Sequence, residues 1–105
     1  MIGIYKIENL INGKVYIGQS IHIERRWQEH CRDSAKSVIA EAIRKYGVKN
    51  FSFEVLKECP VEELDELEKF YIKEYGSLVP FGYNVDSGGN SNHTSFAVYD
   101  SAEFQ

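Results

Sequence analysis

The pattern of apolar and polar positions along the chain predicts three strands. Apolar residues alternate with polar ones over residues 2–7 and again over residues 14–18, which is typical of strands with one buried face. The Asn12-Gly13 dipeptide between them is a strong hairpin-turn signal, so the two strands are expected to pair antiparallel. A third alternating segment, residues 51–56, predicts the third strand.

Three other segments repeat their apolar residues every three or four positions, as one face of a helix does. They cover about residues 23–32, residues 37–46, where Ser37 is a candidate N-cap, and about residues 60–75, which begin with acids. The apolar face of the second helix is expected to hold Val38, Ile39, Ala42 and Ile43. The order β-β-α-α-β-α predicts an α+β domain, in which helices pack on a small three-stranded antiparallel sheet.

The length of the chain, 105 residues, fits one domain with a single modest core. We expect this domain to occupy residues 1–87, and the glycine-rich start of residues 88–105 predicts a C-terminal tail or the beginning of a linker. No apolar run approaches the roughly 20 residues that span a bilayer, and no signal-peptide pattern is present, so a cytoplasmic protein without membrane contact is expected.

Charge is distributed unevenly between the two halves of the chain. Residues 1–50 contain nine Lys or Arg against five acids, whereas residues 51–105 contain three against eleven. A basic half could face phosphates while the acidic half faces solvent. Chance clustering explains the same counts equally well in a small chain of net charge −4, so charge alone does not establish a nucleic-acid partner.

Glu68 is an acid within an apolar helical stripe. It lies one turn after Leu64 and one turn before Ile72, so its carboxylate is expected to point toward the core. A carboxylate in that place is costly unless it is paired or bound to a metal. The structural alternative is a Glu that pairs with a buried Arg or extends to the edge of the stripe.

Arg26 and His30 lie four residues apart in the first predicted helix and therefore share a face. The guanidinium of Arg26 could bind a phosphate through its rigid donor fork. The structural alternatives are a solvated basic pair with Arg25 and an ordinary structural histidine. Tyr5 and Tyr16 lie on the paired strands within reach of a common site, although strand packing alone would also explain them.

Five short segments together resemble the motifs of a known family, in the same order. They are Gly3-Ile4-Tyr5, Tyr16-Ile17-Gly18, the stretch from Ile23 to His30 with Arg26 four residues before His30, the stretch from Leu67 to Lys73 with Glu68, and Gly82-Tyr83-Asn84. This ordered set resembles the GIY-YIG nuclease superfamily, and most of all its homing-endonuclease type. The resemblance extends over roughly residues 3–84 and implies the same α+β layout.

The resemblance implies a metal-dependent DNA endonuclease, which hydrolyses a phosphodiester with one divalent cation, Mg²⁺ or Mn²⁺. Glu68 would hold the metal, which prefers oxygen ligands and keeps several waters. Arg26 would stabilise the extra negative charge of the transition state. Such a catalyst must neutralise charge, activate water and stabilise the leaving oxygen.

The resemblance also assigns roles to the remaining residues of the site. Tyr5 is the candidate general base for the attacking water, with His30 helping to orient or deprotonate that water. Since a free tyrosine has a pKa near about 10, nearby positive charge would have to lower the pKa of Tyr5. Tyr16 would support the water or the phosphate, and Asn84 would brace the site.

Members of this family usually cut DNA where another domain places them, so a separate targeting domain or a partner subunit is expected. The alternative function is a catalytically idle module that binds nucleic acid or protein on the same fold. A further alternative is a structural metal site built from Cys31, Cys59, His22 and His30, although their spacing fits no zinc pattern. Because the two cysteines also form no CxxC pair, reduced thiols are expected.

Overall fold

The fold is a three-stranded antiparallel sheet with helices on both of its faces. The computed structural model describes residues 1–32 and 37–88. Its elements are β1 (Gly3–Asn9), β2 (Val15–Ser20), α1 (Ile23–His30), α2 (Val38–Tyr46), β3 (Phe51–Glu58) and α3 (Leu64–Tyr75), with short 3₁₀ turns at Val48–Asn50 and Val61–Glu63. The predicted order β-β-α-α-β-α is therefore confirmed, as is the α+β class.

The sheet has the strand order β2-β1-β3, and all its pairs are antiparallel. The β1–β2 hairpin closes at the predicted turn, where Gly13 has a φ of 78° and the Asn12 side chain accepts a hydrogen bond from the backbone N–H of Lys14. In this register Tyr5 of β1 lies directly opposite Gly18 of β2. The central strand β1 thus carries Tyr5 between two partner strands.

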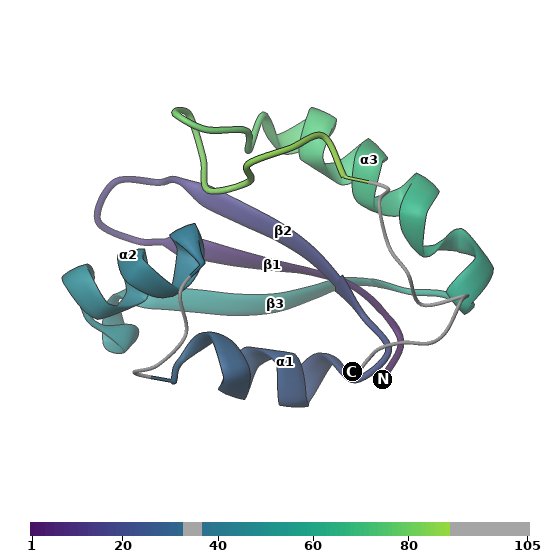
Figure 1. The fold of residues 1–105 in the computed structure, drawn as a ribbon, viewed down its shortest axis with the longest axis horizontal. Helices are drawn as coiled ribbons and strands as arrows, with labels where there is room; N and C mark the ends of the chain where they lie inside the picture. Colours follow the sequence, from purple (N-terminus) through teal and green to yellow (C-terminus); the bar gives the residue numbers. More distant parts are fainter. Residues whose placement is uncertain (33–36, 89–105) are drawn as a thin grey trace.

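Buried side chains alternate between the two faces of the strands, so the protein has two separate cores. One core lies between the sheet and the helices α1 and α2, and it consists of Tyr5, Ile7, Ile23, Ile39, Ala42, Ile43, Phe51 and Tyr83. The other lies under α3 and consists of Ile4, Ile17, Leu64 and Ile72. In Figure 1, α3 lies along the β2 side of the sheet, whereas α1 lies on the other side of the molecule. Both β1 and β2 therefore lie between the two helical layers, and β2 is the edge strand of this pair.

All three predicted helices need correction. Val38 is not part of the apolar face of α2, because it is the first residue of the helix and its side chain is 40% exposed, whereas Ile39, Ala40, Ala42 and Ile43 are buried. The first predicted helix ends at His30 rather than near residue 32, with Cys31 as its C-cap. The third begins as a 3₁₀ turn and becomes α-helical at Leu64.

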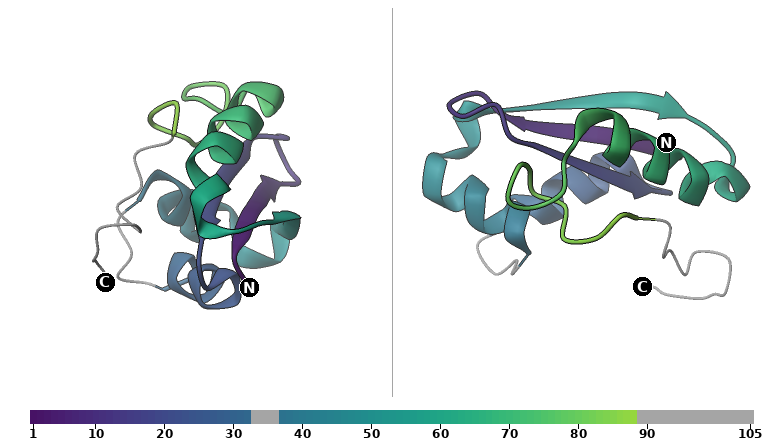
Figure 2. Two further views of the ribbon diagram at one scale, coloured as in Figure 1. Left: turned by 90° about the vertical axis from the view of Figure 1, so that its right-hand side faces the viewer. Right: turned by 90° about the horizontal axis from the view of Figure 1, so that it is seen from above.

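The segment after α3 returns to the hairpin end of the sheet. Gly76 ends α3 in the left-handed conformation, with a φ of 58°. The chain then crosses beside β2, where the backbone N–H of Tyr83 donates to the carbonyl of Val15 at 2.9 Å. Figure 2 shows this segment in green beside the hairpin. Apart from Gly88, the predicted tail at residues 88–105 lies outside the described residues.

No helix within residues 1–32 and 37–88 is both long enough and apolar enough to cross a membrane.

Candidate active site

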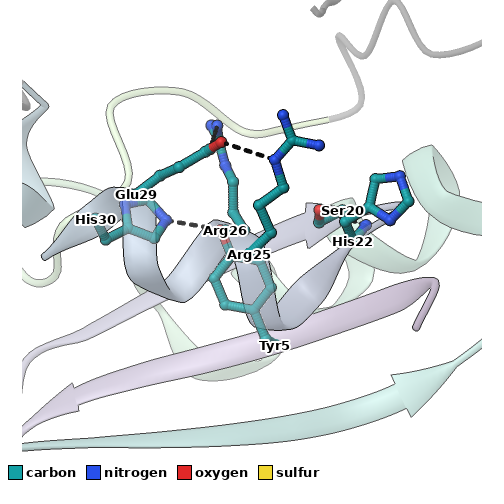
Figure 3. Close-up of polar contacts among 7 residues, drawn as sticks. All are labelled: Tyr5, Ser20, His22, Arg25, Arg26, Glu29 and His30. Carbon is teal, nitrogen blue, oxygen red and sulfur yellow. Dashed lines mark hydrogen bonds and ion pairs between the residues drawn. The ribbon is translucent and has the colours of Figure 1, made fainter. Parts of the chain in front are cut away.

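The centre of the candidate site is a hydrogen bond between Tyr5 and His30. The Tyr5 side chain is fully buried, and its hydroxyl lies 2.8 Å from His30 Nε2 (Figure 3). The ring of Tyr16 packs beside both residues, with its centroid 6.3 Å from that of Tyr5 and 5.3 Å from that of His30. The two tyrosines therefore lie together on paired strands, as the sequence predicts, and share His30 as a neighbour.

Gly18 has a steric role in this cluster. A Cβ atom at this position would lie 2.3 Å from Cζ of Tyr5 and 2.4 Å from its hydroxyl. The Tyr5 ring therefore crosses β2 over the one residue that has no side chain. The glycine of the Tyr16-Ile17-Gly18 segment is needed so that the tyrosine of the preceding strand can reach α1.

Helix α1 presents Arg26 and His30 toward the tyrosines. His30 is buried, whereas the Arg26 side chain is 48% exposed and forms an ion pair of 3.0 Å with Glu29. Glu29 also pairs with Arg25 at 3.6 Å, so one carboxylate links both arginines (Figure 3). Arg25 is 71% exposed and fits the solvated role. Arg26 differs because its charge reaches the buried cluster, as the pKa values show.

Burial has the largest influence on the pKa values of His30, Tyr5 and Tyr16. It lowers the pKa of His30 to about 3, with a second contribution from the Arg26 guanidinium. Burial, and then the neighbouring Tyr16, raise the pKa of Tyr5 well above its ordinary value, although Arg26 acts to lower it. Burial also raises the pKa of Tyr16. At neutral pH His30 is therefore uncharged, and in the tautomer with its proton on Nδ1 its Nε2 accepts from the Tyr5 hydroxyl.

This result differs from the expectation that nearby positive charge lowers the pKa of Tyr5. The expected cation is present as Arg26, but burial of the phenol outweighs it. In the protein alone, Tyr5 is a protonated hydrogen-bond donor rather than a poised base.

Glu68 lies on the opposite side of β2 from this cluster. It is half-buried between the buried residues Leu64 and Ile72, as the helical stripe predicts. Its Oε1 accepts a hydrogen bond of 3.0 Å from the side-chain amide of Gln19 on β2. The charge of Glu68 raises the pKa of both Tyr5 and Tyr16. The carboxylate thus acts on the tyrosines across one strand.

Asn84 is a brace for β2. Its Oδ1 accepts from the backbone N–H of Ile17 at 2.9 Å, and its Nδ2 donates to the carbonyl of Ile17 at 2.8 Å. The buried hydroxyl of Ser77 donates to the same Oδ1 at 2.7 Å. Asn84 is buried, and each of its side-chain polar atoms has a partner within the protein. Its place therefore fits the bracing role that the resemblance implies.

The structural metal site of cysteines and histidines is not formed. Among the described residues, no three His, Cys, Asp or Glu side chains converge in a way that could hold a metal. His30 belongs to the Tyr5 cluster, whereas Cys59 packs against the core under α3, on the other face of the sheet.

The site contains two residues that sequence reasoning did not select. Gln19 contacts Glu68, and Ser77 contacts Asn84. A signal for Gln19 was available, because it follows Ile17 by two residues on the same strand and so shares the face that packs under α3. Ser77 carried no comparable signal, since it follows the end of a helix in an irregular segment.

Comparison with known proteins assigns the chain to a family. A family model described as the GIY-YIG catalytic domain matches residues 1–84. The chain belongs to the GIY-YIG family. The family and the fold of the chain were therefore both predicted correctly from the sequence.

Individual relatives of this GIY-YIG chain agree with that assignment. It is 37% identical over 90 residues to Intron-associated endonuclease 1 of Enterobacteria phage T4, a match that covers 79% of this chain and 36% of that protein. It is 33% identical over 90 residues to the putative endonuclease segD of the same phage, covering 85% of this chain and 39% of that protein. The chain thus spans little more than a third of the length of these two relatives.

A solved structure shows the same fold. The catalytic domain of homing endonuclease I-TevI superposes with a TM-score of 0.71 at 34% identity, covering 82% of this chain and 99% of that one. The three-stranded antiparallel sheet and the α+β layout of the GIY-YIG chain match that domain.

Proposed function

We propose that this GIY-YIG domain is a DNA endonuclease that hydrolyses phosphodiester bonds with a divalent cation. One observation carries the proposal: a buried tyrosine–histidine pair, a partly exposed arginine and a half-buried carboxylate all meet at the edge strand β2. The endonuclease names of the family's T4 members favour the same chemistry.

Tyr5 and His30 provide a route for the proton of the attacking water. The water can give its proton to the phenol oxygen of Tyr5 while the phenol proton passes over 2.8 Å to His30 Nε2. Tyr5 then need not ionise in advance, which fits its raised pKa. An anionic phosphate beside Arg26 offsets part of the charge that keeps the pKa of His30 low. Substrate binding therefore makes His30 a better acceptor.

Arg26 is the group that receives the phosphate. Its pairing with Glu29 is partly exposed and therefore weak, so a phosphate can replace the Glu29 carboxylate. The guanidinium remains charged throughout and offers its donor fork to the transition state. Tyr16 packs against His30 and keeps its ring in place beside Tyr5.

Glu68 is the residue that would hold the cation. Its carboxylate fits a hard, oxygen-preferring ion, and the described residues around it form no nitrogen or sulfur cluster suited to zinc. When bound, Mg²⁺ or Mn²⁺ would neutralise charge on the phosphate and on the leaving oxygen.

A separate DNA-targeting domain or partner subunit also belongs to this proposal. The homologous region accounts for only 36% of Intron-associated endonuclease 1, so most of that relative has no counterpart in this chain. The domain then supplies cleavage, and its partner supplies the choice of site.

Plasmid cleavage tests the proposed function. Supercoiled plasmid incubated with the protein should become open-circular or linear with Mg²⁺ and stay intact with EDTA. Glu68→Ala should abolish cleavage, whereas Glu66→Ala, which removes an exposed acid from the same helix, should cut at the parent rate. A parent protein that binds DNA at low salt but never cuts it would instead favour the idle binding module.

A further inference from the structure

Gln19 connects two carboxylates of α3. Its side-chain Nε2 donates to Oδ1 of Asp65 at 2.9 Å and to Oε1 of Glu68 at 3.0 Å. A primary amide has two N–H donors, so each carboxylate receives one. The acids stand three residues apart on the helix and face β2 together, which would be unfavourable for two like charges without a donor between them.

The carbonyl oxygen of the Gln19 amide indicates that the two carboxylates determine the orientation of this amide. Its Oε1 is buried and has no hydrogen-bond partner among the described residues. A buried acceptor without a partner is unfavourable, and such a group in a native protein calls for an explanation. Turning the amide over would place Oε1 against two carboxylate oxygens, which is worse. The two acids therefore fix the orientation of the amide.

An apolar residue would suit this position better if packing were the only requirement. Gln19 shares its face of β2 with Ile17, in the core that α3 covers. A methionine of similar length would fill the same space without an unpaired carbonyl. The polar side chain is unfavourable for packing alone, and one of the two groups that it contacts is the carboxylate of the candidate metal ligand.

Glu68 is also confined from a second direction. A Cβ atom at Gly88 would lie 3.1 Å from Oε1 of Glu68 and 2.8 Å from Cδ1 of Ile72. The backbone of residue 88 thus lies close against the carboxylate that also accepts from Gln19. Few orientations remain open to this side chain.

We propose that Gln19 is a positioning residue that holds the Glu68 carboxylate in its reactive orientation, with Asp65 as the second anchor of the Gln19 amide. The inference rests on the proposed function, because it assigns Glu68 the role of metal ligand. Asp65 acts through the amide in this arrangement and does not itself hold the cation. Partners that orient a metal ligand commonly change activity about 10- to 100-fold when they are removed.

Single-turnover cleavage at saturating protein concentration tests the role. Gln19→Met should cut about tenfold or more slowly and need more Mg²⁺, while the half-saturating protein concentration stays at the parent value. Gln28→Met, the same change at an exposed glutamine of α1, should behave as the parent does. Asp65→Asn should retain most of the rate, because its amide oxygen still accepts from Gln19, whereas Asp65→Ala should lose part of it.

Two outcomes of the kinetics would overturn the proposal. One is a Gln19→Met protein that folds and cuts with the parent rate and the parent Mg²⁺ dependence. The other is an Asp65→Asn protein as impaired as Glu68→Ala, because Asp65 would then act as a ligand itself.

A measurement on the protein alone keeps the test independent of cleavage. In ¹⁵N–¹H spectra without metal, Asp65→Ala and Glu68→Ala should each shift the side-chain NH₂ resonances of Gln19, whereas Glu66→Ala should leave them in place. Unchanged resonances in both variants would overturn the proposal. If the parent cuts nothing but these shifts occur, the arrangement stands and the proposed function fails instead.

Discussion

The two faces of the sheet carry opposite halves of the candidate chemistry. The face under α1 holds a buried, uncharged pair, Tyr5 and His30, with the Arg26 charge at its rim. The face under α3 holds two carboxylates and the amide that separates them. One strand, β2, lies between these groups. In the proposed mechanism, this separation would let the acids share a substrate with Tyr5 and His30 without disrupting the neutral proton route.

The pKa values show why this separation matters. Even across β2, the charge of Glu68 raises the pKa of Tyr5 and of Tyr16. A carboxylate on the same face would raise these pKa values further and would draw His30 toward its charged form. The strand therefore limits, but does not abolish, the effect of the Glu68 charge on the two tyrosines.

On the α1 face, the largest effect is expected from removing the positive charge of Arg26. Arg26→Ala should reduce the single-turnover rate of plasmid cleavage about 10²- to 10³-fold, because one preorganised donor to the transition state is worth about 3 kcal/mol. Arg25→Ala, which removes a more exposed partner of the same Glu29, is the control and should change the rate little. Equal losses in both variants would show that α1 supplies only general electrostatic attraction.

A smaller effect on cleavage is expected from a substitution that displaces the Tyr5 ring but leaves the residue itself unchanged. Gly18→Ala places a methyl group 2.3 Å from the Tyr5 ring, so it should lower the free energy of unfolding by about 1–3 kcal/mol and slow cleavage. Urea denaturation measures the first effect. In a Tyr5→Ala background the same substitution should be nearly neutral, and a full effect in that background would rule out the steric explanation.

Acid should destabilise the α1 face through His30. The folded protein holds this imidazole neutral down to about pH 3, whereas the unfolded chain protonates it near its ordinary pKa of 6.5. The stabilisation is complete above pH 6.5 and is lost as the pH falls, with a slope of up to about 1.4 kcal/mol per unit. Urea melts from pH 7 to pH 4 should show this slope, and His30→Gln should flatten it.

The smallest expected effect concerns the exposed ion pair at the rim. Glu29→Gln removes a carboxylate that competes with phosphate for Arg26, so DNA affinity at low salt should rise by a few-fold at most. Fluorescence anisotropy with a labelled duplex measures it, and the gain should disappear at high salt. A loss of affinity would mean that Glu29 orients Arg26 rather than competing for it.

Local sequence signals were sufficient to predict most of the fold. The Asn12-Gly13 turn fixed the hairpin register that brings Tyr5 and Tyr16 together, and Gly76 marked the end of α3. The helical period also placed Glu68 between two buried residues. The burial of Val38 was predicted wrongly, since periodicity gives an angle around the helix but not whether another element covers its first turn.

The properties of the site were harder to predict because they depend on contacts between distant segments. The direction of the Tyr5 pKa shift follows from burial by both the sheet and α1, and a local sequence pattern contains no measure of that burial. The Gln19 contacts join residues 46 and 49 positions apart, and those of Asn84 with Ile17 join residues 67 apart. Motifs pointed to the candidate site residues, but not to the residues that contact them.

The contacts of Asn84 also bear on self-association. An edge strand presents unpaired N–H and C=O groups, which is a template on which another chain can add a strand. On β2 the Asn84 amide occupies both outward backbone groups of Ile17, and the N–H of Tyr83 occupies the carbonyl of Val15. The same side chain that braces the candidate site therefore occupies the middle of this edge, where it hinders intermolecular β-pairing.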